Sequence, residues 1–209
     1  MKNKKLAISS LVMLLPVIAG VLLWGKLPES MPVHFNLAGE ADGFASKYTA
    51  VLVMPLLLLA LHLFLIFMVN HDPKKKNVSG KVESLVYWMC PIVSLFVSFG
   101  IMAFSLGYDI KMNAVCFAFV GIIFIIIGNY LPKCQQNYTV GIKLPWTLND
   151  KENWRKTHRM AGPLWIVGGI VILISAYFGK MGQYIFLAVL LAMVIIPAAY
   201  SFSLYKKKA

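Results

Sequence analysis

Long uncharged stretches alternate with short charged connections along the whole chain. Six segments of 18 to 23 residues contain no Asp, Glu, Lys or Arg: 6–25, 49–69, 85–106, 113–131, 161–178 and 183–205. A helix needs about 20 residues to cross the hydrocarbon core of a bilayer. The segments lack the polar and apolar alternation of barrel strands, so they predict six membrane-spanning helices.

Composition agrees with this pattern. Of the 209 residues, 59% are hydrophobic and only 13% are charged. A soluble domain of this length needs a more polar surface. We therefore expect an all-α integral membrane protein without a soluble domain of appreciable size. Pro16, Pro55, Pro91 and Pro197 lie inside the uncharged segments, where membrane helices tolerate them.

The basic residues are divided unequally between the two sides that six spans define. Sixteen lie in the N-terminal tail, the connection between the second and third spans, the loop 132–160 and the C-terminal tail, against four on the other side. The acidic residues divide evenly, four and four. Because Lys and Arg concentrate in cytoplasmic loops, both termini are expected to be cytoplasmic. Loop 26–48 then faces outward.

The outward loop 26–48 gathers one imidazole, one amide and two carboxylates. These belong to His34, Asn36, Glu40 and Asp42. One interpretation is a metal site formed by His34, Glu40 and Asp42, but this spacing matches no established metal motif. We favour a compact, internally hydrogen-bonded cap, and no cofactor is expected. The small core of that cap would be Phe35, Leu37 and Phe44.

The cytoplasmic loop 132–160 carries a helix start signal. Asn149 is expected to cap a helix, with Glu152 in capping-box register three residues later. Beyond it, an apolar face and an adjacent basic stripe follow helical spacing. The face holds Trp154, His158, Ala161 and Trp165, and the stripe holds Lys151, Arg155 and Arg159. We expect a short interfacial helix that bends into the fifth span.

This basic segment has two interpretations. It anchors the chain on anionic membrane lipids, or it is a docking face for a cytoplasmic partner, placed by Gly141 and the Pro145-Trp146 pair in a defined loop. Direct nucleic-acid binding is not expected, because the basic residues form no known DNA-reading motif.

Two stretches resemble known families. LPESMPVHFNLAGEADGFASK resembles the DUF1648 signature, and GNYLPKCQQNYTVGIKLPWTLNDKENWRKTHRMAG resembles the core of the SdpI family. Lys143 stands where an Arg is common, which keeps the charge but loses the planar fork. The resemblance predicts a DUF1648-like two-helix segment over 1–70 and an SdpI-like four-helix region over 71–209.

The resemblance implies an immunity protein that gives resistance to a secreted, membrane-active peptide toxin. It also implies a receptor that holds a transcriptional repressor at the membrane when the toxin engages it. Ligand sensing in the outward loop would fall to His34, Asn36, Gly39, Asp42 and Lys47. The cytoplasmic output would fall to Gly141, Lys143, Pro145, Trp146, Trp154, Arg155, His158 and Arg159.

A transporter and an enzyme are two other function classes for such a chain. A transporter of small solutes or peptides remains the alternative; His62 is the one charge-capable side chain well inside an uncharged segment, and a lone His more often joins helices. Gly121, Gly128, Gly168 and Gly169 are expected to permit close helix packing. An enzyme is not expected, because HExxH, GxSxG and Walker A motifs are absent.

Overall fold

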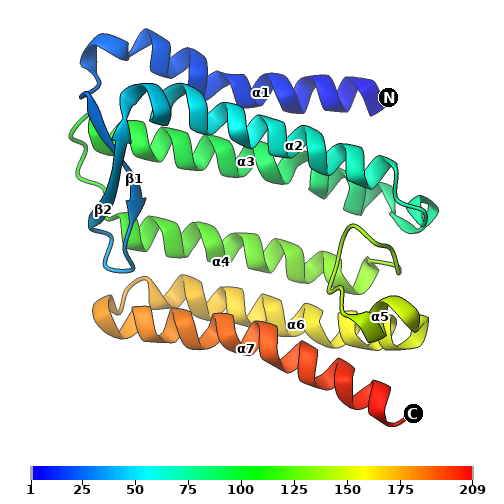
Figure 1. Cartoon of the computed structure of the whole chain (residues 1–209). Coiled ribbons are helices and arrows are strands. Elements are labelled where there is room, and N and C mark those ends of the chain that lie inside the picture. Colours follow the sequence, from blue (N-terminus) through cyan, green and yellow to red (C-terminus); the bar gives the residue numbers. More distant parts are fainter. Residues whose placement is uncertain (1, 209) are drawn as a thin grey trace. The chain divides into compact units, whose positions relative to one another are not determined.

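The computed structural model describes residues 2–208 and is dominated by long helices (Figure 1). The helices are α1 Lys2–Leu22, α2 Met54–Asn70, α3 Gly80–Ser105, α4 Met112–Tyr130, α5 Pro145–Asn149, α6 Lys151–Ser175 and α7 Gly179–Lys206. All but α5 belong to the six segments that are long and apolar enough to cross a membrane. The expected six-helix membrane fold is confirmed.

The chain divides into two compact units. The first comprises the chain up to residue 70 together with 83–111, and the second comprises 71–82 and 112 onward. By these contacts α3 groups with α1 and α2, whereas α4 to α7 form the second unit. The family resemblance predicted a different kind of boundary, between a DUF1648-like segment 1–70 and an SdpI-like region 71–209. That boundary separates family segments rather than compact units, and it stays a prediction.

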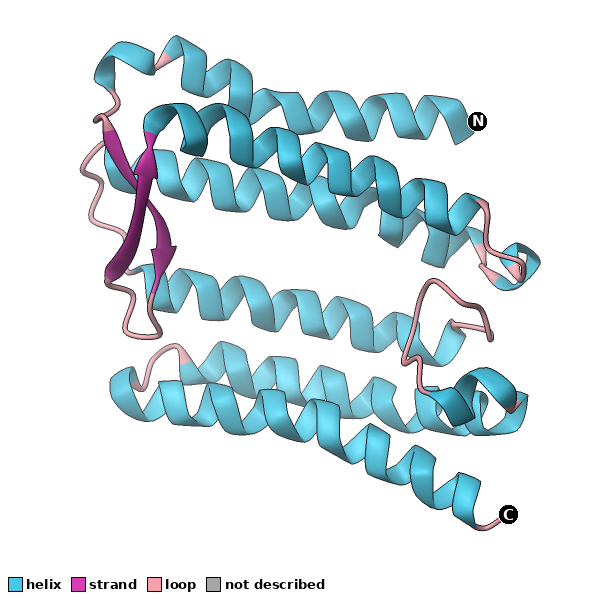
Figure 2. Cartoon of the chain, viewed as in Figure 1, coloured by secondary structure: helices cyan, strands magenta, loops and turns pink. Residues whose placement is uncertain are grey.

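In the first unit, the loop 26–48 contains a hairpin that was not expected from the sequence (Figure 2). Strands β1 Ser30–Phe35 and β2 Ala41–Ser46 pair antiparallel. The expected cap is internally hydrogen-bonded, but its expected core is wrong: Phe44 is 60% exposed and Leu37 36% exposed. One face of the hairpin instead packs Met31 and Phe35 against a hydrophobic cluster on the helix ends. Phe44 and Leu37 are not part of that cluster.

The backbone widens where α2 begins. Residues Thr49–Val53 form a π-helix, η2, and Pro55 follows in the first turn of α2. Proline has no N–H to give to the carbonyl four residues back, and its ring clashes with that carbonyl. The wider turn before Pro55 accommodates this.

In the second unit, α4 and α6 approach closely along a seam of glycines. A Cβ on Gly121 would lie 2.7 Å from the carbonyl oxygen of Gly169, and one on Gly128 would lie 2.8 Å from that of Gly162. The two pairs are seven residues apart on each helix, so they stack on one antiparallel interface. Small residues at such positions let membrane helices pack backbone to backbone, which confirms this expectation for Gly121, Gly128 and Gly169.

Two expectations for the loop 132–160, called the basic loop from here on, need correction. α6 is one continuous helix from Lys151, so the interfacial segment and the fifth span are not separate helices. Asn149 does not cap it, since Asn149 is the last helical residue of α5. Asp150 has the extended backbone that a cap requires, and its carboxylate accepts the N–H groups of Glu152 and Asn153.

Candidate functional site

The hairpin exposes one imidazole–carboxylate pair. His34 Nδ1 lies 2.5 Å from Asp42 Oδ1, and the two side chains are 71% and 45% exposed. Gly43 is the partner of His34 across the hairpin. A Cβ at Gly43 would lie 2.8 Å from the His34 Cβ, so the glycine lets the ring lie over the strand. Two of the residues named for sensing, His34 and Asp42, therefore lie together on the hairpin.

The other expected sensing residues build the hairpin. Asn36 Oδ1 accepts the N–H groups of Ala38 and Glu40, which closes the turn as an Asx-type loop. Gly39 has φ +87° within that turn, a conformation that glycine adopts without steric cost.

Lys47 fixes the base of the hairpin. Its ammonium lies 2.8 Å from Glu29 Oε1, donates to the Trp24 carbonyl, and sits 5.1 Å from the centre of the Trp24 ring. Its side chain is only 13% exposed. Lys47 is thus bound to its own chain rather than offered to a ligand.

The alternative metal site is not formed. Glu40 accepts a hydrogen bond from the Asn36 amide at 3.0 Å and does not join His34 and Asp42. Across residues 2–208, no group of three His, Cys, Asp or Glu side chains is arranged to hold a metal ion. A His with one carboxylate supplies too few protein ligands for a closed site.

The second unit contains a buried polar network that joins residues 71–77 to the basic loop. Asp72 accepts from Tyr138 N–H, from the Thr139 hydroxyl and from Lys74 N–H. Burial alone would raise the pKa of Asp72, but these hydrogen bonds hold it below the ordinary value. Asp72 is 6% exposed. Because its hydrogen bonds favour the ionised carboxylate, Asp72 can link the two loop segments as a charged acceptor.

Gln136 and Asn137 hold the loop from within. The Gln136 amide donates to the carbonyls of Thr147 and Leu148, and its oxygen accepts from the Lys74 ammonium. The Asn137 amide donates to two loop carbonyls and its oxygen accepts two loop N–H groups. Both side chains are buried, and every polar atom they carry is paired.

Gly141, Trp154 and His158 form the centre of this loop. His158 Nε2 accepts the Ile142 N–H at 2.9 Å, and Nδ1 lies 2.9 Å from the Trp154 carbonyl. These partners assign the proton to Nδ1 and make the imidazole neutral. The Trp154 ring stacks on His158 and its Nε1 donates to the Cys134 carbonyl. Burial raises the pKa of the Cys134 thiol to about 11.

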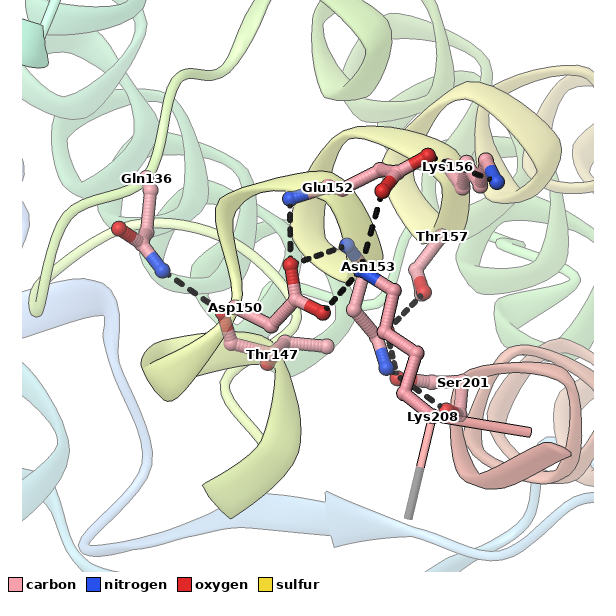
Figure 3. A network of polar contacts seen from close by, with 9 residues as sticks. All are labelled: Gln136, Thr147, Asp150, Glu152, Asn153, Lys156, Thr157, Ser201 and Lys208. Carbon is pink, nitrogen blue, oxygen red and sulfur yellow. Dashed lines mark hydrogen bonds and ion pairs between the residues drawn. The ribbon is translucent and has the colours of Figure 1, made fainter. Parts of the chain in front are cut away.

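A second polar cluster joins α6 to α7 (Figure 3). The Asn153 amide donates to the Ser201 carbonyl, and its oxygen accepts from the Ser201 and Thr157 hydroxyls. At its edge, Lys208 binds Asp150 and Glu152. The bond from Lys208, supported by helix N–H groups, lowers the pKa of Asp150.

The expected output residues therefore separate into two groups. Gly141, Trp154 and His158 belong to the buried loop centre. The side chains that remain exposed or half-buried are Lys143, Pro145, Trp146, Arg155 and Arg159. Trp146 packs against Phe202 and Tyr205 of α7 and lines a groove of about 510 Å³ with Pro145, Asn149 and Lys208.

Sequence reasoning missed most of the structural polar residues. Asp72, Gln136, Asn153 and Ser201 gave no local signal, because each has a partner distant in sequence: Asp72–Tyr138 are 66 residues apart, Gln136–Thr147 11, and Asn153–Ser201 48. The motif stretch already contained Asn137 and Thr147, but its spacing does not reveal that these side chains bond to the backbone of their own loop.

Comparison with known proteins connects both regions to one family. The SdpI/YfhL protein family matches residues 133–201, and the domain of unknown function DUF1648 matches residues 11–59. The chain is 29% identical over 209 residues to "Immunity protein SdpI" of Bacillus subtilis (strain 168), which covers 98% of this chain and 97% of that protein. The chain is therefore similar to this immunity protein along nearly its whole length, and to the SdpI/YfhL family over residues 133–201. No solved structure is significantly similar to it.

The matched segments coincide with the two regions described above. The SdpI/YfhL match contains the loop centre and the α6–α7 cluster, and the DUF1648 match contains the whole hairpin. Outside them, His62 of α2 lies 3.0 Å from the Ser9 hydroxyl of α1. This contact joins two helices, as expected for a lone intramembrane histidine.

Proposed function

We propose that this chain is a bacterial membrane immunity protein that confers resistance to a secreted, membrane-active peptide. The observation that carries the proposal is the match to Immunity protein SdpI along nearly the full length of both chains. The six helices long and apolar enough to cross a membrane support the assignment of such a protein to a membrane.

The proposal includes an orientation. Six spans bring both termini and the basic loop to one side, which carries most of the Lys and Arg residues. This side is the cytoplasm by the positive-inside rule, and the hairpin faces outward. A reporter active only in the cytosol, fused after Lys208, gives signal in this orientation. Activity only with an export-dependent reporter would invert it.

Peptide sensing is assigned to the exposed face of the hairpin. Asn36, Gly39 and Lys47 position the strands, whereas His34 and Asp42 present a polar pair to the outside. A peptide backbone or charged side chain can bond to the free imidazole nitrogen or to a carboxylate lone pair.

Inward reporting is assigned to the exposed part of the basic loop. Its cations, with the half-buried Trp146, offer a cytoplasmic transcriptional repressor a charged and aromatic surface, a composition typical of binding hot spots. The buried loop centre would transmit nothing by direct contact; it holds this surface in one conformation.

Survival of toxin-exposed cells tests the proposed immunity. The chain is expressed in Bacillus subtilis 168 from which SdpI has been removed, and killing by wild-type culture supernatant is measured. We expect increased survival with the chain, reduced by His34→Ala or Asp42→Ala at equal membrane abundance. Ser30→Ala, an exposed hairpin change outside the pair, is the matched control. Equal killing with and without the chain would refute protection against that organism's toxin.

A further inference from the structure

A basic pocket lies where α4 ends and α6 begins. Its volume is about 510 Å³, and its lining residues are Asn77, Pro132, Lys133, Cys134, Gln135, Gln136, Lys151, Trp154 and Arg155. Three of these are cations, and no acidic side chain from the described chain is among them. The pocket therefore has a strongly positive potential.

Within residues 2–208, no acidic side chain forms an ion pair with Lys133, Lys151 or Arg155. Lys151 and Arg155 stand one turn apart on α6, a spacing at which like charges repel each other. The nearest acid along the helix, Glu152, is instead bound to Lys156 and Lys208.

The third cation, Lys133, contacts two neutral groups in the described part of the chain. Its ammonium lies 3.2 Å from Asn129 Oδ1 and 5.4 Å from the centre of the Tyr130 ring. An anion in the pocket would relieve the repulsion among all three cations.

The position of the pocket indicates which anion. α4 ends at Tyr130 and α6 starts at Lys151, and both helices are apolar enough to span a membrane. Their polar ends are expected at the depth of the lipid headgroups. Pro132 and Trp154 add apolar surface to the lining, and Gln135 carries an exposed amide that can donate to a phosphate oxygen.

We propose that this pocket binds the phosphate of an anionic phospholipid headgroup from the surrounding leaflet. Basic pockets between membrane helices are known to bind such headgroups. A lipid is favoured over free phosphate because its acyl chains remain beside the apolar helices while its phosphate enters the pocket. The site lies outside the hairpin and the exposed aromatic groove, so it goes beyond the proposed immunity.

Native mass spectrometry of the purified full chain tests this site. The protein is mixed with phosphatidylglycerol or phosphatidylcholine, and the retained lipid is counted. We expect wild type to retain phosphatidylglycerol preferentially. The double variant Lys151→Gln, Arg155→Gln should bind it about fivefold more weakly for each cation removed. The double variant Lys206→Gln, Lys207→Gln removes two exposed cations outside the pocket and should bind as wild type does.

Three results would overturn the proposal. One is equal phosphatidylglycerol retention by wild type and the pocket variant, and another is an equal loss in the C-terminal control. The third is displacement of the lipid by millimolar inorganic phosphate, which would assign the pocket to a soluble anion. The charge-preserving variant Lys151→Arg, Arg155→Lys should retain the lipid. Cell survival is not the readout, so failure of the immunity proposal leaves this test unaffected.

Discussion

Gly141 lies against His158 so closely that no side chain fits between them. A Cβ at Gly141 would lie 2.5 Å from His158 Nε2 and 2.9 Å from the Trp154 ring. Its φ of +123° is also a conformation that L side chains rarely adopt. The backbone must pass here for Ile142 N–H to reach Nε2.

We predict that Gly141→Ala destabilises the basic loop. Steric overlap and backbone strain together should cost about 2–4 kcal/mol. Thermal unfolding of the purified protein in detergent measures this loss. Gly107→Ala has the strain of a positive φ but open space, and Gly25→Ala has open space with no positive φ. The expected order of stability is Gly25→Ala, then Gly107→Ala, then Gly141→Ala, and a stable Gly141→Ala protein would contradict the described loop.

The ionised Asp72 carboxylate predicts a pH-dependent stability. Its folded pKa lies below the ordinary value of 3.8, so the carboxylate contributes stability above about pH 4. That contribution falls as the pH drops through the folded pKa. Asp72→Asn replaces an acceptor with an amide facing N–H donors, and should cost about 1–3 kcal/mol at pH 7.

Unfolding of wild type and Asp72→Asn at pH 7 and near pH 3 checks this sign. The difference between the two proteins should shrink at the acidic pH, because wild type loses its advantage there. Asp109→Asn, at a carboxylate in the connection 106–111 between α3 and α4, is the control. A gap that widens on acidification would show that Asp72 does not link the loop segments as an ionised acceptor.

Asn153 and Ser201 should be energetically coupled. The Ser201 hydroxyl donates to the Asn153 side-chain oxygen, the Asn153 amide donates to the Ser201 backbone carbonyl, and both side chains are buried. Asn153→Ala removes the acceptor of the buried Ser201 hydroxyl, and should cost about 1–3 kcal/mol. A double-mutant cycle with Ser201→Ala should give a coupling energy of about 0.5–3 kcal/mol. Additive effects in thermal unfolding would mean that the two residues do not depend on each other.

The six spans could be predicted because charge exclusion from the bilayer acts along the sequence itself. The hairpin could not, because its strand pairing depends on packing against helix ends that are distant in the sequence. The N-cap of α6 likewise depended on structure that the local sequence does not show. Asn149 and Asp150 are both good N-cap residues, and only the existence of α5, which includes Asn149, selects Asp150.

For the site, the sequence indicated which residue types are present, but not which of them are buried in the loop centre and which are exposed. His158 and Arg159 are neighbours in the same motif, yet His158 is 1% exposed and Arg159 is exposed. The helical phase separates them, and that phase was predicted. That His158 would bond to the Ile142 backbone was not, because it requires the loop to return over α6 with a positive φ at Gly141.

Gly43 offers a test of the hairpin that does not alter the sensing pair itself. A methyl group at Gly43 would overlap the Cβ of His34, so Gly43→Ala should displace the ring from Asp42. If the exposed pair senses the peptide, survival with Gly43→Ala should fall as far as with His34→Ala, at equal membrane abundance. Full protection by Gly43→Ala alongside loss in His34→Ala would show that the imidazole acts without its position over the strand.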